Sequence, residues 1–295
     1  MPTCVIFNPV ARGDKARHFR QHLDALGHVA TLLQTSGPGD ATRLAAQAVR
    51  AGFDTLVAAG GDGTLNEVVN GLAGAPGGLA GARLGLLPLG TVNVFARELA
   101  IPQEFAPAWQ VILRGHETRV DLPHARWATA GVKSARWFCQ LAGAGLDARA
   151  IALVDWSLKK KVGPLAYVLA GFEALGETQT QISVQAGDRV ESGALVLLGN
   201  GRLYGGDFAL FPDADLRDGL LEVCIFPRVH LGTLARVAPQ LLACQRLPEG
   251  AVRRLRAPVV TLTASGGAFQ VDGEWAGHLP VTFALESKGL RVIVP

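Results

Sequence analysis

The sequence is poor in cysteine, and its few cysteines are not spaced as metal ligands. Four cysteines occur in 295 residues, without a CxxC pair. Three of them, Cys4, Cys139 and Cys224, lie in apolar runs typical of strands, which favours buried thiols over disulfides or zinc ligands. The seven histidines form no HxxxH pair, so we expect a structural or surface role for each.

Long apolar runs, a secretory signal and a strong net charge are also absent. No apolar stretch of about 18 residues or more occurs, and the first residues, MPTCVIFNPVARG, lack the charged-then-apolar order of a signal. A formal net charge of +3 is too small to indicate a nucleic-acid partner. The length suits two domains with ordinary cores. We therefore expect a cytoplasmic protein that binds no nucleic acid.

The most informative segment is GGDGTLNEVVNGL, which begins at Gly60. It follows the apolar run 56–59, a short buried strand, and its own apolar residues recur with the period of a helix. A glycine turn between strand and helix leaves backbone N–H groups free and removes Cβ atoms, so phosphate is its natural ligand. Asp62 would repel phosphate there unless it bound Mg²⁺ or accepted a proton from a substrate hydroxyl.

A tight connection without a function is the alternative for a turn as short as GGDG. The longer string resembles the first motif of the diacylglycerol-kinase catalytic domain, which is shared by bacterial lipid kinases, ceramide kinases and sphingosine kinases. Four other segments resemble motifs of that family, in the same order along the chain. They are the strand and NPxxG-like loop at Asn8, LGLLPLGTVNVFAR at 84–97, GNGRLYGGDFALFPDADLRDGLLEV at 199–223 and VDGE at 271–274.

The spacing of apolar residues along the sequence changes near residue 120. Strand-like and helix-like runs alternate before it, and beyond Asp121 the period shifts toward two. These patterns predict an α/β domain over residues 1–122, with a parallel sheet covered by helices, and a mostly antiparallel β-sandwich domain over 123–295. The resemblance implies the same NAD kinase and diacylglycerol kinase-like architecture, with the nucleotide between the domains. Two helical insertions are expected, at 147–174 and 230–244, and the partner of the terminal strand near 290–294 is left open.

The resemblance implies an ATP-dependent lipid kinase that phosphorylates the hydroxyl of diacylglycerol or a related long-chain alcohol with the help of Mg²⁺. It also implies which residues hold ATP. They are Asn8, Gly60, Gly61, Gly63, Thr64, Leu65, Asn66, Gly90, Thr91, Asn93 and Glu274. For the threonines and asparagines the alternative is turn and N-cap chemistry, which these residue types favour anyway.

The general base is expected at Asp272, because the family's DGE motif places this carboxylate beside the lipid hydroxyl. Asp62 is the rival, since sphingosine-kinase-like members use the equivalent carboxylate. The plain alternative for Asp272-Gly273 is a hairpin turn, for which this dipeptide is a strong signal.

A second cation site is suggested at 213–220, where clustered oxygens on a tight loop suit Mg²⁺. By resemblance its ligands would be the Asp218 side chain and the backbone carbonyls of Asp215 and Leu220, and an acidic surface turn is the alternative. The family usually carries Asp at the position of Val94. Valine cannot bind Mg²⁺, so a thinner metal network and lower activity are expected.

The prediction of a lipid acceptor depends on Trp156 and on the neighbouring cations Lys159, Lys160 and Lys161. This cluster predicts reversible docking on the inner face of the membrane, and a solvated helix end is the alternative. A homodimer is left open. NAD kinase also carries a GGDG turn, but the adjacent Asn66 and the DGE segment favour a lipid kinase. Val94 motivates a third hypothesis, a non-catalytic module that responds to nucleotide.

Overall fold

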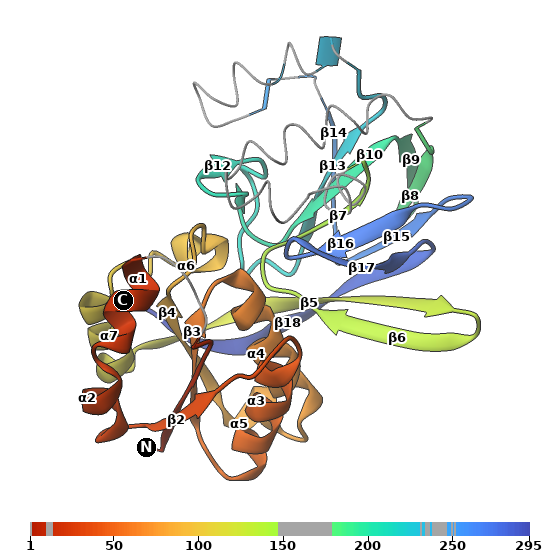
Figure 1. The fold of residues 1–295 in the computed structure, drawn as a ribbon. Coiled ribbons are helices and arrows are strands. Elements are labelled where there is room, and N and C mark those ends of the chain that lie inside the picture. Colours follow the sequence, from red (N-terminus) through yellow and green to blue (C-terminus); the bar gives the residue numbers. More distant parts are fainter. Residues whose placement is uncertain are drawn as a thin grey trace.

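The α/β half and the β-rich half predicted from the sequence are both present in the computed structural model (Figure 1). The structure describes residues 2–9, 14–146, 179–230, 232, 233, 237, 247, 248, 250 and 252–295. The expected helix at 147–174, most of the one at 230–244, and the cluster of Trp156 with Lys159, Lys160 and Lys161 lie outside these residues.

The N-terminal half is built on a parallel sheet in the order β2-β1-β3-β4. Its strands are β1 (Thr3–Phe7), β2 (Thr31–Gln34), β3 (Thr55–Gly60) and β4 (Arg83–Pro88). Every residue of β3 is buried. A parallel strand covered on both faces reads as a continuous apolar run rather than an alternation, as LVAAG does.

Helices cover both faces of this sheet. Figure 1 shows α3, α4 and α5 on one side of the strands and α1, α2 and α7 on the other. The helices are α1 (Asp14–Arg20), α2 (Leu23–Gly27), α3 (Asp40–Arg50), α4 (Asp62–Gly74), α5 (Gly78–Gly81), α6 (Val94–Glu98) and α7 (Phe105–Arg114). In α3 the apolar residues recur with the spacing of an amphipathic helix, and Leu44 and Ala48 are buried in the core.

The C-terminal half packs two sheets face to face, with Phe269 and Phe283 in the core between them. One of these sheets has the order β14-β13-β10-β7-β16-β17, and the other continues the N-terminal sheet through β18, β15, β8 and β9. The strands first named here are β7 (Leu141–Gly145), β8 (Ile182–Ala186), β9 (Arg189–Gly193), β10 (Leu195–Gly199), β13 (Leu221–Phe226), β14 (Arg253–Ala257), β15 (Val259–Thr263), β16 (Ala268–Val271), β17 (Glu274–His278) and β18 (Val281–Ile293), and β11 (Leu203–Tyr204) pairs with β12 (Phe208–Ala209). In β8, Ile182, Val184 and Ala186 are buried while the residues between them are not, as the period of two predicts.

Two long strands join the halves. β5 (Glu117–Thr129) pairs along β18 and continues into a hairpin with β6 (Val132–Trp137). β18 also reaches the parallel sheet, where Val292 lies opposite Leu84 of β4. The C-terminus therefore lies beside the α/β half (Figure 1). The expected domain boundary after residue 122 falls within β5. One sheet runs through both halves, because β18 pairs with β4 of the parallel sheet and with β15 of the sandwich.

Cys4, Cys139 and Cys224 are buried free thiols, as predicted. Burial raises the pKa of Cys4 to about 12 and also raises that of Cys224 to about 12. None of the described helices combines the length and the apolar character needed to cross a bilayer.

Candidate active site

The sequence-predicted phosphate turns gather at one edge of the parallel sheet. Asn8 follows β1, Gly60 ends β3, and Gly90 comes soon after β4. Parallel neighbours end at the same edge, and open α/β sheets bind ligands in the crevice outside the carboxyl ends of their strands. A cavity at this edge is lined by Gly60, Gly61, Asp62 and Asn93 among others.

The glycines of this edge allow the two turns to touch. A Cβ added to Gly90 would lie 2.6 Å from the Cα of Gly61, and one added to Gly60 would lie 2.4 Å from Oγ1 of Thr64. Real Cβ atoms do not approach so closely. Glycine is therefore required at Gly90 for the close packing of the two turns, and at Gly60 to leave room for the Thr64 side chain, whatever ligand the turns hold.

Asn93 closes the second turn with its own side chain. Its backbone is left-handed, with φ 53°, and its amide accepts a hydrogen bond from the Gly90 N–H at 3.1 Å and donates one to the Gly90 carbonyl at 2.7 Å. Asn93 also donates to Gln103 at 3.1 Å. This is the turn chemistry named above as the alternative. Thr91, by contrast, is exposed.

Asp62 opens α4, and its carboxylate faces the backbone N–H groups of Val94, Asn93 and Phe95 at the start of α6. Burial, and after it the negative charge of Asp272, raise the pKa of Asp62 to about 6, although these three N–H groups act in the opposite direction. The side chain of Val94 is buried. At this position the chain thus presents a backbone donor to Asp62 instead of a second carboxylate.

Asp272 lies in the tight turn between β16 and β17. Asp272 and Gly273 both have positive φ, 47° and 81°, as the hairpin reading predicted. The same carboxylate also reaches away from its hairpin: Oδ2 accepts from the Cys139 N–H at 2.8 Å, and Oδ1 accepts from the N–H groups of Gln140 at 3.0 Å and Leu141 at 3.1 Å. Desolvation raises the pKa of Asp272 against the effect of these bonds.

One contact joins helix α4, which follows the glycine turn, to the β16–β17 hairpin that carries Asp272. The Nδ2 of Asn66, on the second turn of α4, donates to Oδ2 of Asp272 at 2.9 Å. Asn66 is buried. Its neighbour Leu65 turns its side chain into the α/β core, and the Leu65 N–H donates to the Gly61 carbonyl at 3.1 Å. The hairpin carboxylate therefore lies against the helix that follows the glycine turn.

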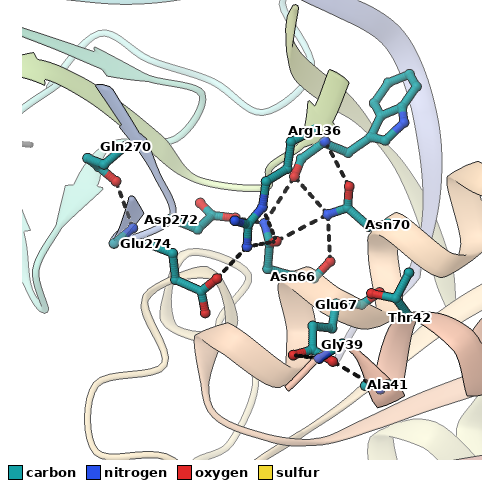
Figure 2. A network of polar contacts seen from close by, with 12 residues as sticks. Gly39, Ala41, Thr42, Asn66, Glu67, Asn70, Arg136, Gln270, Asp272 and Glu274 are labelled. Carbon is teal, nitrogen blue, oxygen red and sulfur yellow. Dashed lines mark hydrogen bonds and ion pairs between the residues drawn. The ribbon is translucent and has the colours of Figure 1, made fainter. Parts of the chain in front are cut away.

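Arg136, on β6, is a site residue that the sequence did not reveal (Figure 2). Its guanidinium donates to Oδ1 of Asn66 from Nε at 3.2 Å and from Nη2 at 3.0 Å, and it forms an ion pair with Glu274. Glu274 in turn approaches the first turn, since its Oε1 lies 3.0 Å from where a Cβ of Gly63 would be. A lone arginine in an alternating strand gives no signal by itself, because its partners come from distant segments.

Contacts of α6 add to the connection between the halves. Arg97 pairs with Asp207 at 2.9 Å, and the carboxylate of Glu98 accepts from the Leu203 N–H at 2.8 Å and from Gln140 at 3.0 Å. The side chain of Glu98 is only 5% exposed. The loop that holds Asp62 is thereby tied to the C-terminal half.

The expected second cation site lies on the loop before β13. The carboxylate of Asp218 accepts from the Leu220 N–H at 2.8 Å and forms an ion pair with Arg256, and the carbonyl of Asp215 accepts from the Asp218 N–H at 3.3 Å. Among the described residues, no group of three or more His, Cys, Asp or Glu side chains is placed to hold a metal. A cation at Asp218 would have to displace Arg256.

Comparisons with known proteins agree with this arrangement. The model of the diacylglycerol kinase catalytic domain matches residues 2–125, and that of the YegS C-terminal NAD kinase beta sandwich-like domain matches residues 140–294. A diacylglycerol kinase of Staphylococcus saprophyticus is 34% identical over 277 residues, covering 92% of this chain and 87% of that protein. One of Staphylococcus aureus is 33% identical over 301 residues, covering 99% and 91%.

The fold has a counterpart among solved structures. The crystal structure of a diacylglycerol kinase from Bacillus anthracis superposes with a TM-score of 0.78 over 100% of this chain and 97% of that chain, at 24% identity. At this level of identity the likeness concerns the fold alone.

Proposed function

The chain belongs to the diacylglycerol kinase family, and from this premise we propose that it transfers the γ-phosphoryl group of ATP to the hydroxyl of diacylglycerol or a related long-chain lipid alcohol. Membership in this family makes the chain a kinase and relates it to lipid kinases. ATP as the donor, Mg²⁺ as the cation and a lipid alcohol as the acceptor go beyond family membership and are part of this proposal.

The contact between Asn66 and Asp272 is the observation that carries this proposal. It joins a glycine turn suited to phosphates and a carboxylate suited to proton removal, which come from different halves of the chain. Phosphoryl transfer needs little else from a protein than positioned phosphates, neutralised charge and an oriented acceptor hydroxyl.

ATP would lie along the carboxyl edge of the parallel sheet. Free N–H groups at the start of α4 favour its phosphates, as helix N-termini do generally. The partly exposed Asn8, Gly61, Gly63 and Thr64 and the exposed Thr91 remain accessible there, whereas Leu65 is buried. Asn66 and Asn93 would shape the site rather than contact ATP, because their amides are already bonded within the protein.

Asp272 is proposed as the general base, with Asp62 as the rival. Asp272 is partly exposed, although each of its oxygens accepts two hydrogen bonds from Asn66, Cys139, Gln140 and Leu141, so proton uptake weakens at least one of them. A pKa of about 6 makes Asp62 the closer match to a base that works near neutral pH. The substitution Asp272→Asn distinguishes the two, because it removes the base only if Asp272 has that role.

Mg²⁺ fits the site as an ion shared with the nucleotide. Asp62 and Asp272 repel each other, and a cation between protein and phosphates would relieve that repulsion. Mg²⁺ is usually held by one or two carboxylates, waters and substrate phosphates rather than by an all-protein cage. Asp62 would hold it, with Glu274 near the turn as a second oxygen donor. The ion would supply charge neutralisation on the transferring phosphoryl group.

A transfer assay tests the proposal. The protein is incubated with γ-labelled ATP and Mg²⁺ against a panel of lipid alcohols and against NAD. Label in the lipid phase supports the lipid kinase, label in NADP identifies an NAD kinase, and binding of ATP without either product identifies a nucleotide-responsive module. Omission of Mg²⁺ with a chelator should abolish transfer if the cation is required.

The acceptor implies contact with a bilayer at its cytoplasmic face. We base this on Trp156 and Lys159 to Lys161, since an indole and neighbouring lysines favour the headgroup region of an anionic leaflet.

A further inference from the structure

Trp275 is the only exposed side chain among the Phe, Tyr and Trp residues that the structure describes, and it lies beside the site. It is 49% exposed on β17, the last strand of its sheet. It follows Glu274 directly and comes three residues after Asp272. Single exposed apolar residues are ordinary on protein surfaces, so the exposure of Trp275 has meaning only through this position.

The strand register directs the indole of Trp275 away from the sandwich core. Trp275 pairs with Gln270, which follows the core residue Phe269 and therefore points to the opposite face of the sheet. A second indole, that of Trp127 on β5, lies against the other face of β17, because a Cβ on Gly277 would be 2.7 Å from the Trp127 Nε1. The edge strand beside the site is thus flanked by two tryptophans.

The charges beside Trp275 do not oppose contact with an anionic surface. The neighbouring carboxylate of Glu274 forms an ion pair with Arg136, and Figure 2 shows this pair next to Asp272. The ring of His278 packs edge-on against the indole, with the ring centroids 5.5 Å apart, and adds no negative charge. Repulsion between Glu274 and anionic headgroups is therefore reduced.

A lipid alcohol sets a geometric limit on the site that phosphorylates it. Its chains stay in the hydrocarbon core of the bilayer, since withdrawing them exposes apolar surface to water, and its hydroxyl therefore stays near the headgroups. The headgroup region is only about 6 Å thick on each side of the bilayer. Residues of a strand rise by about 3.3 Å each, so Trp275 and Asp272 lie within roughly 10 Å of each other along the hairpin. An indole at headgroup depth would bring the proposed base within reach of the hydroxyl.

We propose that Trp275 anchors the β16–β17 hairpin in the headgroup region of the bilayer that carries the lipid acceptor, with the edge of β17 facing the membrane. Indoles favour this depth because their ring is apolar and their N–H is polar. The inference rests on the proposed lipid-kinase function, and it names the face of the protein at which the acceptor is taken up.

The first test locates the indole by its fluorescence. Vesicles of phosphatidylcholine and phosphatidylglycerol carry bromine at a shallow or at a deep position of the acyl chains, and bromine quenches tryptophans near its own depth. The wild type is compared with Trp275→Phe and with a control, Trp109→Phe, which changes a partly buried residue of α7. The shallow label should quench the wild type and the control more than the deep label does. Trp275→Phe should lose about half of that quenching, because Trp156 is the other tryptophan expected at this depth. Equal quenching of Trp275→Phe and the wild type would overturn the proposal.

Kinetics separate anchoring from a direct role in the reaction. Trp275→Ala should raise KM for a long-chain lipid alcohol in vesicles about tenfold, and leave kcat and KM for ATP within about twofold of the wild type. With a short-chain acceptor dispersed in detergent, the variant should match the wild type. Val190→Ala changes a residue that is 66% exposed on β9, the last strand of the other sheet, and should match the wild type in both assays.

Two kinetic results would also overturn the proposal. A lower kcat of Trp275→Ala with the short-chain acceptor would mean that the indole shapes the catalytic hairpin. Unaltered vesicle kinetics, with a changed oligomeric state of Trp275→Ala in sedimentation velocity, would mean that a second copy of the chain covers this face. A wild type that labels no lipid while Trp275 is quenched would contradict only the proposed function, and labelled lipid without that quenching would contradict only this inference.

Discussion

Asp62 and Asp272 come from opposite halves of the chain, yet the charge of Asp272 acts on Asp62. Together with the larger effect of burial, it raises the pKa of Asp62 to about 6. The backbone N–H groups at the start of α6 offset this only in part. The site therefore holds two carboxylates whose ionisation is mutually unfavourable, at the place where a cation or a proton would be shared.

Asp62→Asn should raise the melting temperature near pH 7.5 and leave it almost unchanged near pH 4. The folded protein holds the Asp62 proton more tightly than the unfolded chain, so unfolding free energy falls as pH rises from about 4 to 6. Asparagine removes that loss because it does not ionise. Scanning calorimetry across this range checks the sign, and an equal change at both pH values would show that ionisation of Asp62 is not the cause. Phosphoryl transfer should be lost in the same variant.

The local part of this site was predictable from sequence, and the connecting part was not. Strand, glycine turn and helix from Leu56 onward follow one another along the chain, so apolar periodicity and glycine chemistry locate them. The contacts of Asp272 with Asn66 and Cys139 join segments far apart, and no periodicity encodes such a pairing. For the same reason a hairpin turn and a site carboxylate looked like competing readings of Asp272, although the turn holds the carboxylate in the site.

In the fold, too, local features were predictable from the sequence and long-range pairings were not. The alternation in β8 and the buried run in β3 indicated strand types correctly. The partners of β18 could not be predicted, because its first residues pair within the sandwich and Val292 pairs with the parallel strand β4. That exchange of partners depends on where the chain travels in space, which composition and period do not report.

Asp272→Asn should lower turnover by about 10²-fold or more while ATP binding stays near the wild-type level, as expected for loss of a general base. Asparagine leaves an NH₂ group opposite one of the N–H donors of Cys139, Gln140 and Leu141, so a lower melting temperature is also expected. Labelled-ATP transfer and calorimetric ATP titration measure the two effects. A variant that transfers phosphate at the wild-type rate would pass the role of base to Asp62.

Gly90→Ala should disturb the phosphate turns much more than Gly61→Ala. The new Cβ would lie 2.6 Å from the Cα of Gly61 in the first variant, and 3.4 Å from the Cα of Gly90 in the second, an ordinary contact. We expect Gly90→Ala to lose about 1–3 kcal/mol of unfolding free energy and most of its ATP affinity, with Gly61→Ala close to the wild type. Gly61→Val, with two further methyl groups, should lose ATP affinity. Unchanged ATP affinity in Gly61→Val would refute the phosphate cradle.

Arg256→Met should make thermal stability depend on Mg²⁺. The ion pair with Arg256 occupies the carboxylate of Asp218, so its removal leaves that oxygen to a cation. Binding to the folded state alone raises stability with the logarithm of Mg²⁺ concentration. Melting curves with 10-fold steps of Mg²⁺, for this variant with and without Asp218→Asn, decide the matter. A rise that survives Asp218→Asn, or no rise at all, would leave the loop as an acidic turn.

Replacing Lys159, Lys160 and Lys161 with Gln should weaken binding to anionic vesicles by roughly 2 to 3 kcal/mol, because each lysine near an anionic surface contributes about 1 kcal/mol. Activity on detergent-dispersed short-chain substrate should be spared, since the described site residues are unchanged. High salt should bring the wild type toward the variant, because exposed charges are screened within about 8 Å at physiological ionic strength. Arg126 and Lys133, both exposed on the β5–β6 hairpin, supply the matched double variant to Gln. Sedimentation with vesicles at low and high salt measures all three proteins. If the triple variant sediments like the wild type at low salt while the double variant does not, the hairpin rather than the lysine cluster meets the membrane.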